Sequence, residues 1–146
     1  MKSTPSARHR ARRLALQALY QMQFTDEPAS VVEQQFLEGN DHKRADINFF
    51  RDIMDSVGRT RDDLWQLVAP HLDRKSDQID PVERAILLIA CFELRDRLEI
   101  PFKIVISEAI ELAKLFGATD SYKYVNSILD EVSKITRQSE RGSAAD

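Results

Sequence analysis

Apolar residues recur at helical spacing along almost the whole chain. In the first such segment they follow an i, i+3, i+4, i+7 pattern, which places side chains on one face of an α-helix: Ala11, Leu14, Ala15, Ala18, Leu19 and Met22. Similar stripes cover residues 30–38, 46–57, 60–68, 80–97, 101–117 and 120–136. No segment shows the period-two alternation of a strand. The pattern therefore predicts an all-α protein of six to seven helices.

Residues typical of helix ends support these boundaries. Asp80 is followed by Pro81 and Glu83, a combination that strongly indicates a helix start. Asp46 is expected to cap the helix after it, and Gly58 is expected to interrupt that helix. Gly117 suits the left-handed position that often ends a helix.

The helical segments fall into two blocks separated by the polar residues 73–79. We expect residues 1–146 to form a single domain of two three-helix bundles, at about 7–70 and 80–136. Neither block is large enough to be stable alone with much margin, so the two bundles are expected to pack together. Residues 1–6 and 138–146 lack an apolar period and are expected to be flexible.

Composition narrows the class of protein. A chain of 146 residues with 42% apolar residues is long enough for one core and too apolar to be disordered throughout. The single cysteine, Cys91, excludes a disulfide framework and a cysteine-based zinc site, and fits a reducing compartment. The longest apolar stretch, residues 85–92, is too short to span a membrane, and the start lacks a signal-peptide pattern. We expect a cytoplasmic protein.

The net charge of −3 conceals an uneven distribution. Residues 1–25 carry a charge of +5 and no acidic residue, whereas the remaining residues carry −8. The positive charges of this basic arm are Lys2, Arg8, Arg10, Arg12 and Arg13. Such an arm attracts polyanions, because phosphate contacts release counterions, although a solvated and frayed terminus is the alternative interpretation.

The face of the first helix opposite its apolar stripe combines charge with aromatic rings. It holds His9, Arg10, Arg13, Gln17, Tyr20 and Phe24. Guanidinium groups bind phosphates, amides reach base edges and rings stack on bases, so this combination is typical of single-stranded RNA recognition. The alternative is that the two aromatic rings pack on a neighbouring helix.

Residues 85–92 form an apolar helix segment with no polar face. A helix of this kind is either central to the fold or partly covered by a partner, which its flanking residues Glu83, Arg84, Glu93 and Arg95 would surround.

No arrangement of residues indicates an enzyme. The three histidines are scattered without metal-ligand spacing, and no glycine-rich phosphate loop is present. Glu111 and Lys114 lie three residues apart and are expected to form a surface ion pair. We expect no catalytic residue, no metal and no cofactor.

Four segments in order resemble the NusB family of transcription antitermination factors. They are residues 10–20, 82–94, 100–117 and 120–130, and the resemblance spans about residues 8–135. It implies two three-helix bundles and no enzymatic activity. It also implies binding to boxA RNA of ribosomal RNA transcripts, a heterodimer with the ribosomal protein NusE, and assembly with other Nus factors on RNA polymerase.

The resemblance also suggests which residues bind. The arginine-rich start matches the family motif that Tyr20 closes, and Asp120 and Tyr124 match positions near the RNA, although Asp120 could instead cap its helix. The expected RNA-binding residues are Lys2, Arg8, Arg10, Arg12, Arg13, Gln17, Tyr20, Asp120 and Tyr124. The expected NusE-facing residues are Glu83, Arg84, Leu87 and Glu93.

The chain departs from the family pattern at Ser107, Leu88 and Ser127, none of which lies in the RNA arm, and Leu88 and Ser127 bear on the partner face and its neighbours. Two alternative functions stay open. One is an RNA-binding accessory module of ribosomal RNA processing or modification. The other is a helical protein that forms a homodimer through residues 85–92 and binds no RNA.

Overall fold

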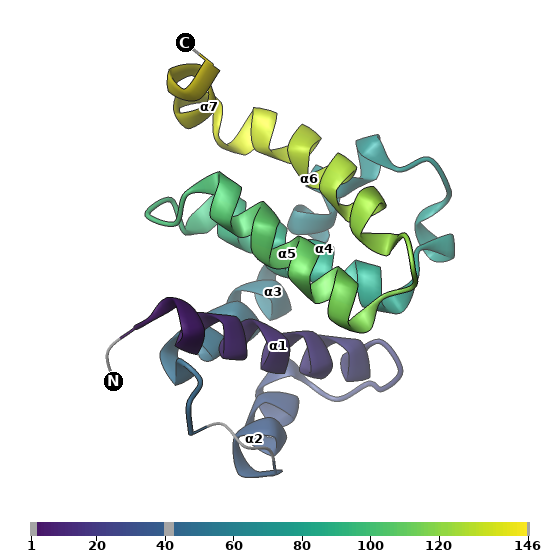
Figure 1. The fold of residues 1–146 in the computed structure, drawn as a ribbon. Helices are drawn as coiled ribbons and strands as arrows, with labels where there is room; N and C mark the ends of the chain where they lie inside the picture. Colours follow the sequence, from purple (N-terminus) through teal and green to yellow (C-terminus); the bar gives the residue numbers. More distant parts are fainter. Residues whose placement is uncertain (1–2, 40–42, 146) are drawn as a thin grey trace. The chain divides into compact units, whose positions relative to one another are not determined.

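The computed structural model describes residues 3–39 and 43–145, with side chains as far as Gly142. This described part is helical and contains no strand (Figure 1). Its α-helices are α1 (Pro5–Met22), α2 (Ala29–Gly39), α3 (Ile47–Val68), α4 (Pro81–Asp96), α5 (Phe102–Phe116), α6 (Ser121–Thr136) and α7 (Gln138–Ala145). Single 3-10 turns cover Ala69–His71 and Ser76–Gln78. The prediction of an all-α fold is confirmed.

The chain divides into two compact units between Arg61 and Asp62. This division lies before the polar segment 70–80, where the sequence analysis placed the boundary between the two blocks. The interruption predicted at Gly58 occurs as a kink inside α3, where Thr60 has non-helical backbone angles (φ −125°, ψ 27°). The Thr60 hydroxyl donates to the carbonyl oxygen of Ser56 (2.7 Å), a bond that bends helices. The two parts of α3 consequently belong to different units.

In the first unit, α1 buries its predicted apolar stripe, and α1 packs on α2. The Thr4 hydroxyl caps α1 by accepting from the backbone N–H of Ala7 (3.0 Å). The carbonyl oxygen of Ala7 accepts from the backbone N–H of Asp46 (3.0 Å). Asp46 in turn accepts from the N–H of Phe49 (3.0 Å), so it caps α3 as predicted. These bonds hold the starts of α1 and α3 together.

In the second unit, α4, α5 and α6 pack on one another. Every residue of α4 from Ala85 to Leu94 is buried, which confirms that this helix is central. The Asp80 carboxylate caps α4 as predicted, accepting from the N–H groups of Val82 (2.7 Å) and Glu83 (3.3 Å). None of the described helices combines the length and the apolar character that a membrane span requires.

The other end of α4 is capped by Arg137, whose side chain is 4% exposed. Its guanidinium donates to three carbonyl oxygens there, those of Leu94 (2.7 Å), Arg97 (3.0 Å) and Glu93 (3.1 Å). Two of these oxygens also accept from backbone, that of Glu93 from the N–H of Arg97 (2.9 Å) and that of Arg97 from the N–H of Ile100 (3.0 Å), so Arg137 adds donors at a helix end where carbonyl groups outnumber N–H groups. Arg137 therefore supplies hydrogen-bond donors to the last carbonyl groups of α4 from a residue that is distant in the sequence.

Most of the segment 138–146, which was expected to be flexible, is helical: α7 covers Gln138–Ala145, and Asp146 lies outside the described residues. Glu140 accepts from Arg137 (2.6 Å) and from the first backbone N–H of α5, that of Phe102 (2.9 Å). Arg141 binds Asp130 on α6 (3.0 Å). Polar contacts rather than an apolar stripe attach this helix, so periodicity did not reveal it.

Gly117 ends α5 without adopting the left-handed conformation that we predicted. Its angles are φ −91° and ψ 177°, those of extended backbone. A Cβ atom at this position would lie 2.7 Å from the carbonyl oxygen of Ala113 and 2.9 Å from the Cβ of Ser121. Glycine is required here by the close approach of the start of α6 to the end of α5.

Gly117→Ala should lower the free energy of unfolding by about 1–3 kcal/mol, because backbone must move to admit the methyl group. Urea unfolding measures this loss. Gly39→Ala is the matched control, since nothing lies within 4 Å of the atom it adds. Equal stability of the two variants would contradict the close approach.

The Cys91 thiol should be unreactive in the folded protein. It lies on α4 and is fully buried, and burial raises the pKa of the thiol to about 12, so almost none is present as the nucleophilic thiolate. Labelling with a thiol reagent near neutral pH should proceed only as fast as the protein unfolds, and faster in urea. Rapid labelling under native conditions would show that α4 is not enclosed.

Candidate functional site

One face of α1 carries the predicted basic and aromatic residues on the surface. Arg10, Arg13, Gln17 and Tyr20 are all exposed and lie three or four residues apart, which places them along one side of the helix. Tyr20 is 42% exposed, and Phe24, just beyond the helix, is 62% exposed. Their rings contact each other (centroids 5.1 Å apart, 57° between planes). The alternative that both rings are buried by a neighbouring helix is wrong.

Arg12 does not belong to this face. Its side chain is 2% exposed, and its guanidinium lies over the ring of Phe49 on α3, 5.1 Å from the centroid. Arg12, which was expected to bind RNA, therefore has almost no surface to offer a ligand in this structure. Its spacing of three and seven residues from the buried Ala15 and Leu19 places it on the inward side of α1.

The first turn of α1 contains no acidic residue, so cations gather where the helix dipole is already positive. Arg8 is half-buried, and its guanidinium donates to the hydroxyl of Ser3 (2.9 Å). Lys2, also predicted to bind RNA, lies outside the described residues. An anion near this helix start would relieve repulsion among like charges and accept from backbone N–H groups.

The second predicted group lies at the start of α6, in the other unit. Tyr124 is half-buried, and burial raises the pKa of its phenol. Its hydroxyl oxygen accepts from the backbone N–H of Asp73 (3.3 Å). The guanidinium of Arg74 lies over its ring, 4.3 Å from the centroid. One face of the Tyr124 ring is therefore covered by a cation.

Arg74 was not predicted to be part of the site, because the sequence of residues 73–79 indicates only a polar connection between helices. Its guanidinium also binds the carboxylate of Asp73 (Nε to Oδ1, 2.7 Å). The hydrogen bonds from Arg74 and then from Tyr124 hold the pKa of the Asp73 carboxyl below its usual value. The polar segment 73–79 therefore places the guanidinium of Arg74 on the ring of Tyr124, which is expected to stack on RNA.

Asp120 occupies the cap position of α6, yet its side chain makes no capping hydrogen bond. Its carboxylate is exposed and faces the ammonium group of Lys123 (3.4 Å). The alternative interpretation of Asp120 as a side-chain cap is wrong, because its carboxylate forms an exposed ion pair instead.

The residues predicted to face NusE do not form a surface. Leu87, Glu93 and Glu83 are 0%, 1% and 6% exposed, so these side chains offer almost no surface to a partner in this structure. Glu83 has one buried carboxylate oxygen without a hydrogen-bond partner. Arg84 is half-buried, donates to the carbonyl oxygen of Ser76, and lies over the ring of Trp65 (4.3 Å). Burial of residues 85–92 likewise contradicts a homodimer formed through that segment.

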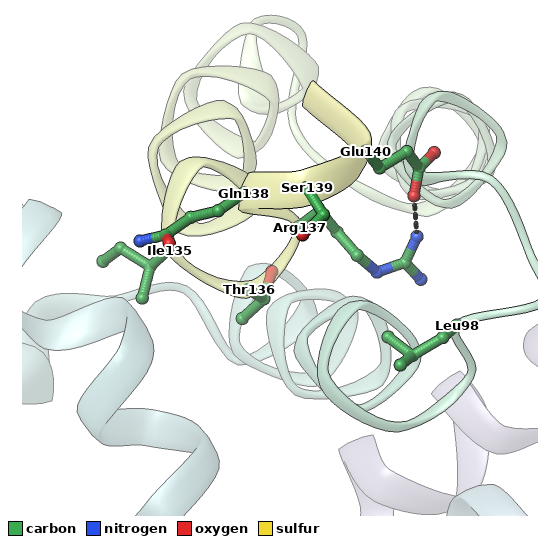
Figure 2. Close-up of a pocket in the computed structure, with 7 residues that line it drawn as sticks. All are labelled: Leu98, Ile135, Thr136, Arg137, Gln138, Ser139 and Glu140. Carbon is green, nitrogen blue, oxygen red and sulfur yellow. Dashed lines mark hydrogen bonds and ion pairs between the residues drawn. The ribbon is translucent and has the colours of Figure 1, made fainter. Parts of the chain in front are cut away.

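A pocket of about 430 Å³ lies beside the junction of α6 and α7 (Figure 2). Figure 2 shows the ion pair between Arg137 and Glu140 at this pocket. The other lining residues are Leu98, Ile135, Thr136, Gln138 and Ser139, none of which was predicted to bind RNA. Within the described part of the chain, no group of three His, Cys, Asp or Glu side chains could hold a metal ion.

Comparison with known proteins identifies relatives over nearly the whole chain. The family model described as the NusB family matches residues 9–134. The transcription antitermination protein NusB of Marinobacter nauticus is 46% identical over 133 residues, covering 91% of this chain and 84% of the relative. That of Alcanivorax borkumensis is 45% identical over 138 residues, covering 94% and 92%.

A solved structure of T. maritima NusB has the same fold. It superposes with a TM-score of 0.77 at 31% sequence identity, covering 92% of this chain and 93% of that one. Sequence, helical architecture and family match agree, and the chain therefore belongs to the NusB family.

Proposed function

We propose that this protein is a cytoplasmic, RNA-binding transcription antitermination factor. In this proposal it binds boxA RNA of ribosomal RNA transcripts together with NusE, and it joins other Nus factors to support processive transcription by RNA polymerase. It has no catalytic role and uses no cofactor. The observation that carries the proposal is the exposed face of α1, where Arg10, Arg13, Gln17 and Tyr20 lie in line.

Charge favours RNA at this face and disfavours it elsewhere. Residues 1–25 carry +5, whereas the remaining residues carry −8. Arginines on α1 attract phosphates and release counterions, while the acidic remainder repels a polyanion. The same acidic remainder is complementary to a basic ribosomal protein, which supports a partner of the NusE type. The partner surface must then involve exposed side chains rather than Leu87 or Glu93.

The remaining exposed groups supply contacts to bases. The ring of Tyr20 offers a surface for stacking, and Gln17, three residues before it on the same side of α1, carries an amide that both donates and accepts. Tyr124 supplies a second ring. The carboxylate of Asp120 can accept from a base amino group but repels phosphate. The Gln17 amide and the Asp120 carboxylate would therefore read RNA sequence, while the rings and the arginines provide affinity.

Fluorescence titration of labelled boxA RNA, with and without purified NusE, tests this function. We expect tighter binding to boxA RNA than to a scrambled RNA of equal length, and a gain in affinity when NusE is present. Equal and weak affinity for the two RNAs in the presence of NusE would contradict the proposal.

Arg10→Ala should weaken boxA binding and reduce the slope of log affinity against log salt by about one, because one phosphate contact is lost. Arg59→Ala is the matched control, since Arg59 is also exposed on a helix of the same unit but pairs with Asp55 (3.0 Å). Both variants should unfold at the same urea concentration as the original protein. An unchanged salt slope for Arg10→Ala would remove Arg10 from the RNA path.

A further inference from the structure

Tyr122, on the first turn of α6, has ammonium groups around its ring. The Nζ of Lys114, near the end of α5, lies 4.9 Å from the ring centroid, and the Nζ of Lys123 lies 5.9 Å from it. Both lysines are exposed. Tyr122 itself is half-buried. We had expected Lys114 to pair with Glu111, and the described residues show no such ion pair.

Tyr122 and Tyr124 are two residues apart, so they project about 200° apart around the axis of α6. Each ring has a cation over it, since Arg74 lies over Tyr124. The start of α6 therefore presents two cation-covered aromatic rings on opposite sides. The exposed pair of Asp120 and Lys123 belongs to the same turn.

An aromatic ring flanked by mobile cations is suited to a nucleotide. The ring stacks on the base, and the cations that rested on the ring can turn to the adjoining phosphates. Lysine side chains are long and flexible, and these two are exposed, so displacing them from the ring requires no movement of backbone. A partner's apolar side chain would contact only the ring of Tyr122, and an anionic one would contact only the lysines, whereas a nucleotide can contact both.

We propose that Tyr122, with Lys114 and Lys123, forms a second base-stacking site for single-stranded RNA, in addition to Tyr124. This inference rests on the proposed RNA-binding function. RNA that stacks a base on Tyr124 continues across the first turn of α6 and stacks another base on Tyr122. The site then lengthens the RNA segment that the protein covers.

Base stacking can be measured with boxA RNA that carries 2-aminopurine at one position, scanned along the strand. Stacking on Tyr122 should quench the fluorescence at a defined position, and Tyr122→Leu should restore it there while lowering the affinity about tenfold. Tyr122→Phe retains the ring and should leave the affinity and the quenching unchanged. Tyr124→Leu should restore fluorescence at a different position.

Lys114→Gln provides a second test that leaves Tyr122 in place. It should reduce the salt slope of binding, whereas Lys103→Gln, an exposed lysine at the other end of α5, should not. If the original protein binds boxA RNA but neither Tyr122→Leu nor Lys114→Gln alters binding, the second site is wrong and the proposed function stands. If the original protein binds no RNA in this assay, both the second site and the proposed function are wrong.

Discussion

The burial of α4 on all sides is the constraint on which the second unit depends. From Ala85 to Leu94 no residue of this helix reaches the surface, so other helices must cover every face. The polar groups at both ends of α4 also need partners, because a buried helix end without them is costly. Asp80 meets this need at the start from within the sequence neighbourhood. Arg137 meets it at the end from more than forty residues away.

Arg137 also explains why the chain continues in ordered form after α6. Its guanidinium binds Glu140 as well as the carbonyl oxygens of α4, and Glu140 caps the start of α5 through the N–H of Phe102. One buried cation thus connects the end of α4, the start of α5 and the start of α7. Loss of this side chain would remove its hydrogen bonds to the carbonyl groups at the end of α4 and its ion pair with the Glu140 carboxylate, which caps α5.

Periodicity and capping residues predicted the helices that bury apolar stripes, and they predicted the caps Asp46 and Asp80. They failed where contacts distant in sequence decide the structure. No local pattern shows that Arg12 stacks on Phe49, that Glu140 reaches Phe102, or that Arg74 covers Tyr124. For the candidate site, helical spacing correctly separated the exposed face of α1 from its core stripe. The partner face could not be predicted, because an apolar segment such as residues 85–92 has the same sequence pattern in a protein core and in an interface.

The central claim is that RNA meets this protein at the exposed face of α1 and at the start of α6, while the acidic remainder repels it. Ultraviolet crosslinking of bound boxA RNA, followed by mass spectrometry of the crosslinked peptides, measures this directly. The account predicts crosslinks at Tyr20 on α1 and at the tyrosines that begin α6. Crosslinks confined to peptides outside these two places would contradict it.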